Sequence, residues 1–341
     1  MKYFRNLIIV TILVMGTLYF ANQYLDSYLV MILSNLGIFI ILAVSYNLIN
    51  GVTGQFSLEP NGFVAIGAYV TALLLLSADS KMEQFMLDDP SPFILWMSAS
   101  FVPALLISGI VASLVALTLA FPVFRVRGDY LAIVTLGFGF IIRIFAVNQS
   151  EYTNGSMGLM AIPNEVNLLW IGGFALISVI IVLNIVYSKF GRAMKSIRDD
   201  EDASNAMGIN SFKIKTYAFM TSAFFEGVAG GLMASLLTTI SPEQFSFMLT
   251  FQLLIIIVLG GLGSTSGAII GTIVVVAGME WLRFLDEPNL FGFQTDAHPG
   301  LRMVVFSVIL ILIMIFARKG IMGDREIWDI FRKKGEQNVH K

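Results

Sequence analysis

The chain has 341 residues, of which 57% are hydrophobic and 13% are charged, and its formal net charge at pH 7 is −2. Soluble domains carry about 25% charged residues. The low charge, together with repeated long apolar runs, therefore predicts a polytopic membrane protein and excludes a chain built around one large soluble core. The absence of cysteine excludes disulfides, thiolate nucleophiles and cysteine-ligated metals.

Apolar segments follow one another along the whole chain. About 20 apolar residues suffice to cross a bilayer as a helix. Ten segments approach that length, namely residues 4–22, 28–49, 61–78, 97–122, 129–148, 168–188, 214–236, 249–263, 266–284 and 299–317. The sequence thus predicts a single domain over residues 1–341. We expect an all-α transmembrane helical bundle of about ten membrane segments, some of which can be re-entrant.

Lysine and arginine are distributed unevenly among the connecting segments. With an even number of spans, both termini lie on one side, and that side collects the basic residues of the N-terminus, of residues 125–127, of residues 189–215 and of the tail 318–341. Only Lys81 lies clear of a span on the other side. Because basic residues mark cytoplasmic loops, we expect both termini, the loop and the tail to be cytoplasmic, with the protein in the plasma (inner) membrane.

Two glycine- and proline-containing stretches interrupt the apolar pattern, at residues 51–62 and 238–247. The predicted topology places the first toward the cytoplasm and the second toward the outside. Paired breaks of this kind are typical of a transport pathway, but ordinary interfacial loops would give the same pattern, and both interpretations stay open. Under the first interpretation, the candidate path residues in these stretches are Gln55, Ser57, Glu59 and Ser241.

Glu226 is an ionisable residue in the middle of the seventh apolar segment. Charged groups at such a depth are costly, so they face the interior of a bundle or a water-filled cavity. Glu226 is therefore expected to serve either as a structural hydrogen-bond partner or as a further residue of the translocation path.

The most charged stretch runs from Lys189 to Lys215 and predicts a docking element. Residues 199–207 can form a short helix whose acidic first turn suits the helix dipole, with Gly208 as its stop. Ala203, Ala206 and Met207 then share one face. Such a face suits a groove on another protein, whereas a solvated loop leaves these features unexplained. The candidate coupling residues are Arg192, Arg198, Asp200, Glu201, Ala203, Ala206, Met207 and Gly208.

Other motifs argue against enzyme activity and against a metal or nucleotide site on this chain. The acidic run at residues 199–202 has no second acidic cluster facing it, as metal-dependent diphosphate chemistry would need. The glycines at residues 260–267 join two membrane segments instead of following a strand, and no P-loop lysine motif is present. We therefore expect no enzyme activity, metal, cofactor or nucleic-acid partner. A membrane-embedded enzyme and a passive channel are the alternatives from other classes.

Several motifs together resemble one known family. In the charged loop these are Gly191-Arg-Ala, Ile197-Arg198, Asp200-Glu201, Ala203 and residues 206–210. Elsewhere they are Asn50-Gly51, Thr53-Gly-Gln55, Ser57-Leu58 and residues 63–69, 127–136, 153–155, 158–159, 240–242, 258–264 and 319–323. In this order the motifs resemble LivM-type permeases of branched-chain amino acid ABC importers, over nearly the whole chain.

The resemblance implies a permease that works with a second, homologous permease subunit, two cytoplasmic ATPase subunits that use the ATP, and an extracytoplasmic substrate-binding protein. A related permease for urea or short-chain amides shares much of the pattern and is the alternative. Two departures stand out. Glu59-Pro60 replaces the family's usual Gly-His pair, which bears on the substrate, and Asp202 and Ser204 replace an aliphatic residue and an alanine. Neither of the latter changes breaks the small-residue face.

Overall fold

The computed structural model describes residues 2–85, 89–125, 130–286, 289–290, 293–294, 300–317, 319–323 and 325–327. The side chains of residues 2–10, 289–290, 293–294 and 314 are not described. The start of the motif at residues 127–136 and most of the predicted cytoplasmic tail lie outside the described residues.

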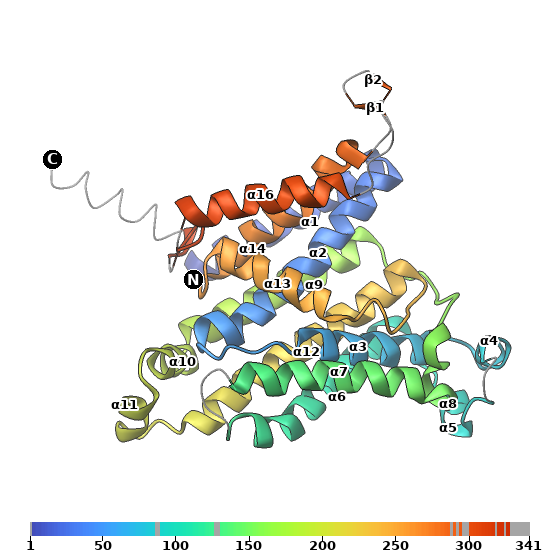
Figure 1. The fold of residues 1–341 in the computed structure, drawn as a ribbon, viewed down its shortest axis with the longest axis horizontal. Coiled ribbons are helices and arrows are strands. Elements are labelled where there is room, and N and C mark those ends of the chain that lie inside the picture. The colour runs from blue at the N-terminus through green and yellow to red at the C-terminus, as the bar shows by residue number, and fades with distance from the viewer. Residues whose placement is uncertain are drawn as a thin grey trace.

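The described chain is almost entirely helical (Figure 1). Its longer helices are α1 (Lys2–Tyr24), α2 (Ser27–Asn47), α3 (Pro60–Leu75), α6 (Phe101–Val123), α7 (Tyr130–Asn148), α9 (Leu168–Tyr187), α10 (Lys189–Asp199), α12 (Ser211–Leu237), α13 (Phe247–Gly260) and α16 (Leu301–Phe316). Short helices are α4 (Ala78–Gln84), α5 (Pro92–Trp96), α8 (Ser150–Thr153), α11 (Glu201–Ala206), α14 (Thr265–Thr272) and α15 (Gly278–Trp281). The remaining elements are the π-helices η1 (Leu48–Val52) and η3 (Ile273–Ala277), the 3-10 helices η2 (Gly155–Met157) and η4 (Leu282–Asp286), and a two-stranded antiparallel hairpin of β1 (Asn289–Leu290) and β2 (Phe293–Gln294).

Each of the ten predicted apolar segments coincides with helix in the structure. Within the described residues, six helical segments are long and apolar enough to cross a membrane, and the sharply bent pair α3–α4 makes a seventh if it is one span. Helix α13 and residues 301–313 of α16 are apolar but shorter. The chain is therefore a multi-pass helical membrane protein, whereas ten crossings and cytoplasmic termini stay predictions.

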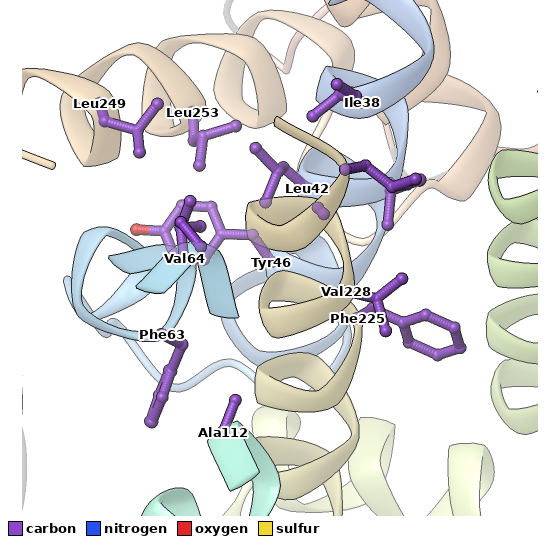
Figure 2. Close-up of a cluster of buried hydrophobic side chains, with 14 of the residues drawn as sticks. Ile38, Leu42, Tyr46, Phe63, Val64, Ala112, Phe225, Val228, Leu249 and Leu253 are labelled. Carbon is purple, nitrogen blue, oxygen red and sulfur yellow. The ribbon is translucent and has the colours of Figure 1, made fainter. Parts of the chain in front are cut away.

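Helix α12 lies at the centre of the bundle and packs against α2, α3 and α6. Small residues allow this close packing. A Cβ atom added at Gly67 would stand 2.0 Å from the carbonyl oxygen of Gly227, and one added at Gly230 would stand 2.1 Å from that of Val64. The buried apolar side chains around this contact come from α2, α3, α6, α12 and α13 (Figure 2).

The two sequence interruptions touch inside the bundle, and their placement toward the cytoplasm and the outside stays a prediction. After η1 the chain turns back, because the Tyr46 hydroxyl and the Asn50 amide both donate to the carbonyl oxygen of Ser57, at 2.6 and 3.2 Å. Helix α3 then begins at Pro60, and the Asn61 amide donates to the carbonyl oxygen of Phe245, 3.2 Å away in the second interruption. Non-helical backbone is tolerated at membrane depth when it is enclosed in protein in this way.

Candidate functional site

The charged loop folds into two short helices, α10 and α11, with Asp200 between them. The Asp200 carboxylate accepts the main-chain N–H of Ala203 at 2.9 Å and thereby caps the first turn of α11. Gly208 follows α11 with a φ of +86°, a conformation that favours glycine. The predicted helix over residues 199–207 is thus shorter than expected, because Asp199 ends α10 and Met207 lies just past α11.

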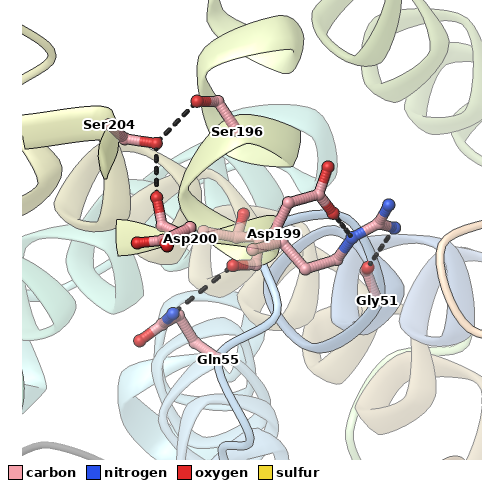
Figure 3. Close-up of polar contacts among 8 residues, drawn as sticks. Gly51, Gln55, Ser196, Asp199, Asp200 and Ser204 are labelled. Carbon is pink, nitrogen blue, oxygen red and sulfur yellow. Dashed lines mark hydrogen bonds and ion pairs between the residues drawn. The ribbon is translucent and has the colours of Figure 1, made fainter. Parts of the chain in front are cut away.

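Helix α11 turns Ser204 toward Ser196 of α10 (Figure 3), and its alanines are exposed. Ser204 is 2% exposed, and its hydroxyl lies 2.6 Å from that of Ser196. Ala203 and Ala206 are exposed, and Met207 has 83% of its surface accessible. Arg192 and Ala203 are among the residues that line an open pocket of about 460 Å³ between the two helices. The face expected to dock a partner is therefore uncovered.

Two polar contacts attach α11 to the first turn of α12. Lys215 Nζ donates to Glu201 Oε2 at 2.7 Å, and the Lys215 side chain is only 7% exposed. The Ser211 hydroxyl donates to Asn205 Oδ1 at 2.8 Å. Since α12 is the central helix of the bundle, these contacts connect α11 to the core.

Arg198 attaches the other side of this unit to the membrane-embedded body. Its Nη1 donates to the carbonyl oxygen of Gly51 in η1 at 3.3 Å, and its Nε pairs with Asp199 at 3.3 Å (Figure 3). A Cβ atom at Gly54 would stand 2.4 Å from Arg198 Cγ, and one at Gly263 would stand 3.0 Å from Nη1. The glycines therefore make room for the arginine side chain, so that one residue contacts both the end of α2 and the turn before α14.

Glu326 is a residue that the sequence does not single out. It is 5% exposed, and its carboxylate accepts the main-chain N–H groups of Thr265 and Ser266 at 2.7 and 2.8 Å. Residues 321 and 322 also donate main-chain hydrogen bonds to Leu259 and Gly260. The glycines of residues 319–323 thus pack on those of residues 258–264. The start of the tail therefore covers the same turn that Arg198 contacts at Gly263.

Glu59 and Glu226 lie close together at the centre of the bundle. Both are 0% exposed, and their carboxylates interact electrostatically. Ser222 Oγ lies 2.9 Å from Glu226 Oε1 and 2.8 Å from the carbonyl oxygen of Ser45. Within the described part of the chain, neither oxygen of Glu59 has a hydrogen-bond partner, and the same holds for Oε2 of Glu226. The structure therefore brings together two of the predicted path residues in an enclosed position.

Among the residues that the structure describes, the other predicted path residues form no hydrogen bond with this pair. Gln55 is half-buried and donates to the carbonyl oxygen of Thr53 at 3.3 Å. Ser57 is buried and its main-chain N–H donates to Asn50 Oδ1 at 2.9 Å. Ser241 follows the bridge between Leu159 and Ile240. A path role for these residues stays a prediction.

We expect the Glu226→Gln variant to unfold at the same temperature as the parent protein or a higher one. The substitution removes one of two neighbouring buried carboxylates, and the new amide N–H can donate to Ser222 while Ser222 donates to Ser45. The gain lies between zero and about 3 kcal/mol. Thermal unfolding in detergent measures it, with Glu243→Gln at an exposed position as the matched control. A clear loss of stability in Glu226→Gln alone contradicts this account.

Among the described residues, no three histidine, cysteine or acidic side chains are grouped as a metal site would require. What the geometry offers instead is mechanical. An exposed two-helix unit is attached to the central helix α12, to the break after α2 and to the turn before α14. This arrangement connects an exposed surface unit to the core of a helical membrane protein.

Comparison with known proteins identifies the family. The model of the branched-chain amino acid transport system permease component matches residues 28–314. The chain is 31% identical to the high-affinity branched-chain amino acid transport system permease protein LivM of Escherichia coli K12, over 84% of this chain and 68% of the relative. It is 24% identical to LivH of Salmonella typhimurium, over 84% and 92%, and 20% identical to a probable LivM of Methanocaldococcus jannaschii, over 87% and 94%.

The chain therefore belongs to the branched-chain amino acid permease family, whose members are transport subunits and not enzymes. Likeness to both LivM and LivH indicates a permease that works with a second permease subunit. No solved structure matches the chain.

Proposed function

We propose that the chain is the transmembrane permease subunit of an ATP-driven importer of branched-chain, hydrophobic amino acids in the plasma (inner) membrane. It forms the translocation path with a homologous second permease. An extracytoplasmic binding protein delivers the substrate, and two cytoplasmic ATPase subunits supply the energy. The observation that carries the proposal is the exposed α11 face, fixed to the bundle through Arg198 and Lys215.

In this account the closure of the ATPase pair on ATP moves α10 and α11 as one body. Arg198 conveys that movement to Gly51 at the end of α2 and to Gly263 before α14, while the Glu201–Lys215 pair conveys it to α12. A shift of packed helices of this kind switches a bundle between two discrete arrangements. The chain itself needs no cofactor, because ATP is used by the partner subunits.

Competition for uptake tests the substrate class. Cells that carry the chain with its native partner subunits take up labelled leucine, and unlabelled leucine or valine should compete while urea should not. Competition by urea and not by valine would favour the related urea or short-chain amide permease, to which the Glu59-Pro60 departure draws attention.

A further inference from the structure

A small polar pocket lies at the opposite end of α2 from the ATPase-coupling unit. It has a volume of about 210 Å³ and lies where the first turns of α2 approach α13, η3, α15 and α16. Tyr28 contributes from the start of α2, whereas Gly51, which Arg198 contacts, follows the end of that helix. A 21-residue helix is about 32 Å long, so pocket and coupling unit lie on opposite sides of the bundle (Figure 1).

The rim of the pocket carries both signs of charge. Glu280 accepts a hydrogen bond from the Tyr28 hydroxyl and pairs with Arg283 Nη1 at 3.0 Å. Arg302, at the start of α16, pairs with Asp286 through Nε at 3.0 Å. A guanidinium has five donor N–H groups, and among the described residues the ion pair of Arg302 is made through Nε. The rim therefore offers a carboxylate for a cationic group and guanidinium donors for an anionic group.

The wall of the pocket is apolar, with two amides set into it. Ile32, Val276 and Met279 supply the apolar surface, and Asn35 and Gln252 supply the amides. Asn35 is exposed although it lies two turns inside an apolar helix. A polar side chain at that depth lines an aqueous path or faces a partner and not lipid.

The backbone beneath the charged rim is irregular. Val276 belongs to the π-helix η3, which is followed by α15 with Glu280 in it. Such π-turns are rare and occur frequently at functional sites. Within the described residues, the second π-helix is η1, at the coupling contact with Arg198. The two irregular turns thus mark the two ends of the proposed transport machinery.

We propose that this pocket binds the free amino acid as a zwitterion on the side remote from the ATPases. The carboxylate binds the guanidinium of Arg302, the ammonium group binds Glu280, and the hydrophobic side chain packs on Ile32, Val276 and Met279. Drug-sized ligands occupy about 300–1,000 Å³, so the smaller pocket suits a single amino acid and excludes a peptide. The inference rests on the proposed function, because it names a binding site for the transported substrate.

Direct binding of labelled leucine to the purified permease–ATPase complex, without the binding protein, tests the site. Val276→Phe fills the pocket and Glu280→Gln removes the carboxylate. Each should weaken leucine binding roughly tenfold or more, the effect of losing one charge-assisted contact. Val304→Phe, the same substitution on the exposed surface of α16, should leave binding unchanged. Co-purification of the ATPase subunits with each permease variant shows that the variant complex is assembled.

Undiminished leucine binding in both pocket variants, or no leucine binding by the parent complex, overturns the inference. A zwitterionic lipid headgroup shares the same chemistry. If phosphatidylethanolamine remains bound to the parent complex, is lost from Val276→Phe, and leucine binding does not change, the pocket is a lipid site and the inference fails. Leucine uptake by cells tests the proposed function separately, so loss of the site and loss of the function are distinguishable.

Discussion

Replacing Ala206 with arginine should abolish co-purification of the ATPase subunits and leave membrane insertion intact. Ala206 is exposed on α11, and its neighbour Met207 has 83% of its surface accessible. Helix α11 is held by contacts of Ser204, Glu201 and Asn205, none of which involves Ala206. The substitution therefore spares the fold and places a long cation on the face that enters the partner's groove.

The binding free energy between permease and ATPase should fall as it does when a central interface residue is lost. That loss is about 2–4 kcal/mol, or roughly 30- to 1,000-fold in affinity. The measurement is the amount of ATPase recovered with the tagged permease from detergent extracts. Ala78→Arg makes the same substitution at an exposed alanine at the start of α4, outside the coupling unit, and should recover ATPase normally. Full recovery with Ala206→Arg would show that α11 does not dock the ATPase.

Replacing Arg198 with alanine should have the complementary effect, in which the ATPase stays bound and uptake falls roughly tenfold or more. Arg198 donates to Gly51 and packs against Gly54 and Gly263, so that its removal separates α10 from the end of α2. A lost hydrogen bond from a charged group costs about 1.5–3 kcal/mol. The docking face of α11 is not altered, which preserves assembly.

The measurements are uptake of labelled substrate and ATP hydrolysis on the same membranes. Together they distinguish a loss of coupling from a loss of ATPase binding. Lys213→Ala removes an exposed cation from the neighbouring turn of α12 and should change neither quantity. If Arg198→Ala transports at the parent rate, then force does not pass through the Arg198–Gly51 contact, and the Glu201–Lys215 pair has to carry it.

Local patterns predicted the parts of the structure that depend on local physics. Apolar runs located all ten helical segments, and the acidic turn before Ala203 with Gly208 after it located α11. The boundary at Asp199 was missed because either of two adjacent aspartates can begin a helix, and in the structure it is the side chain of Asp200 that caps the new one. Caps of this kind compete with helix continuation and are hard to place from sequence.

The contacts that define the site could not be predicted, because they join residues distant in the chain. Arg198 was expected to face a partner, yet it contacts Gly51, and only the cluster of glycines in both motifs hinted at a close approach. Glu326 lies in a tail that the sequence marks only as basic, although it caps α14. The burial of Glu59 beside Glu226 depends on the chain turning back after η1.

The pocket near Tyr28 was also missed by sequence reasoning. Its charged residues are spread over α15, η4 and α16, and each looks like an ordinary residue at the end of a helix. Asn35 was the available signal, since an amide two turns inside an apolar segment is unexpected on a lipid-facing surface. Polar residues at membrane depth are therefore worth the same scrutiny as charged ones.

The central claim is that this chain transports only when a separate ATPase drives it. The most direct test compares uptake of labelled leucine in cells that carry the permease, its second permease and its binding protein, with the ATPase subunits intact, absent or unable to hydrolyse ATP. The account predicts uptake only in the cells whose ATPase subunits are intact. Uptake that persists without ATP hydrolysis would show a passive channel and contradict it.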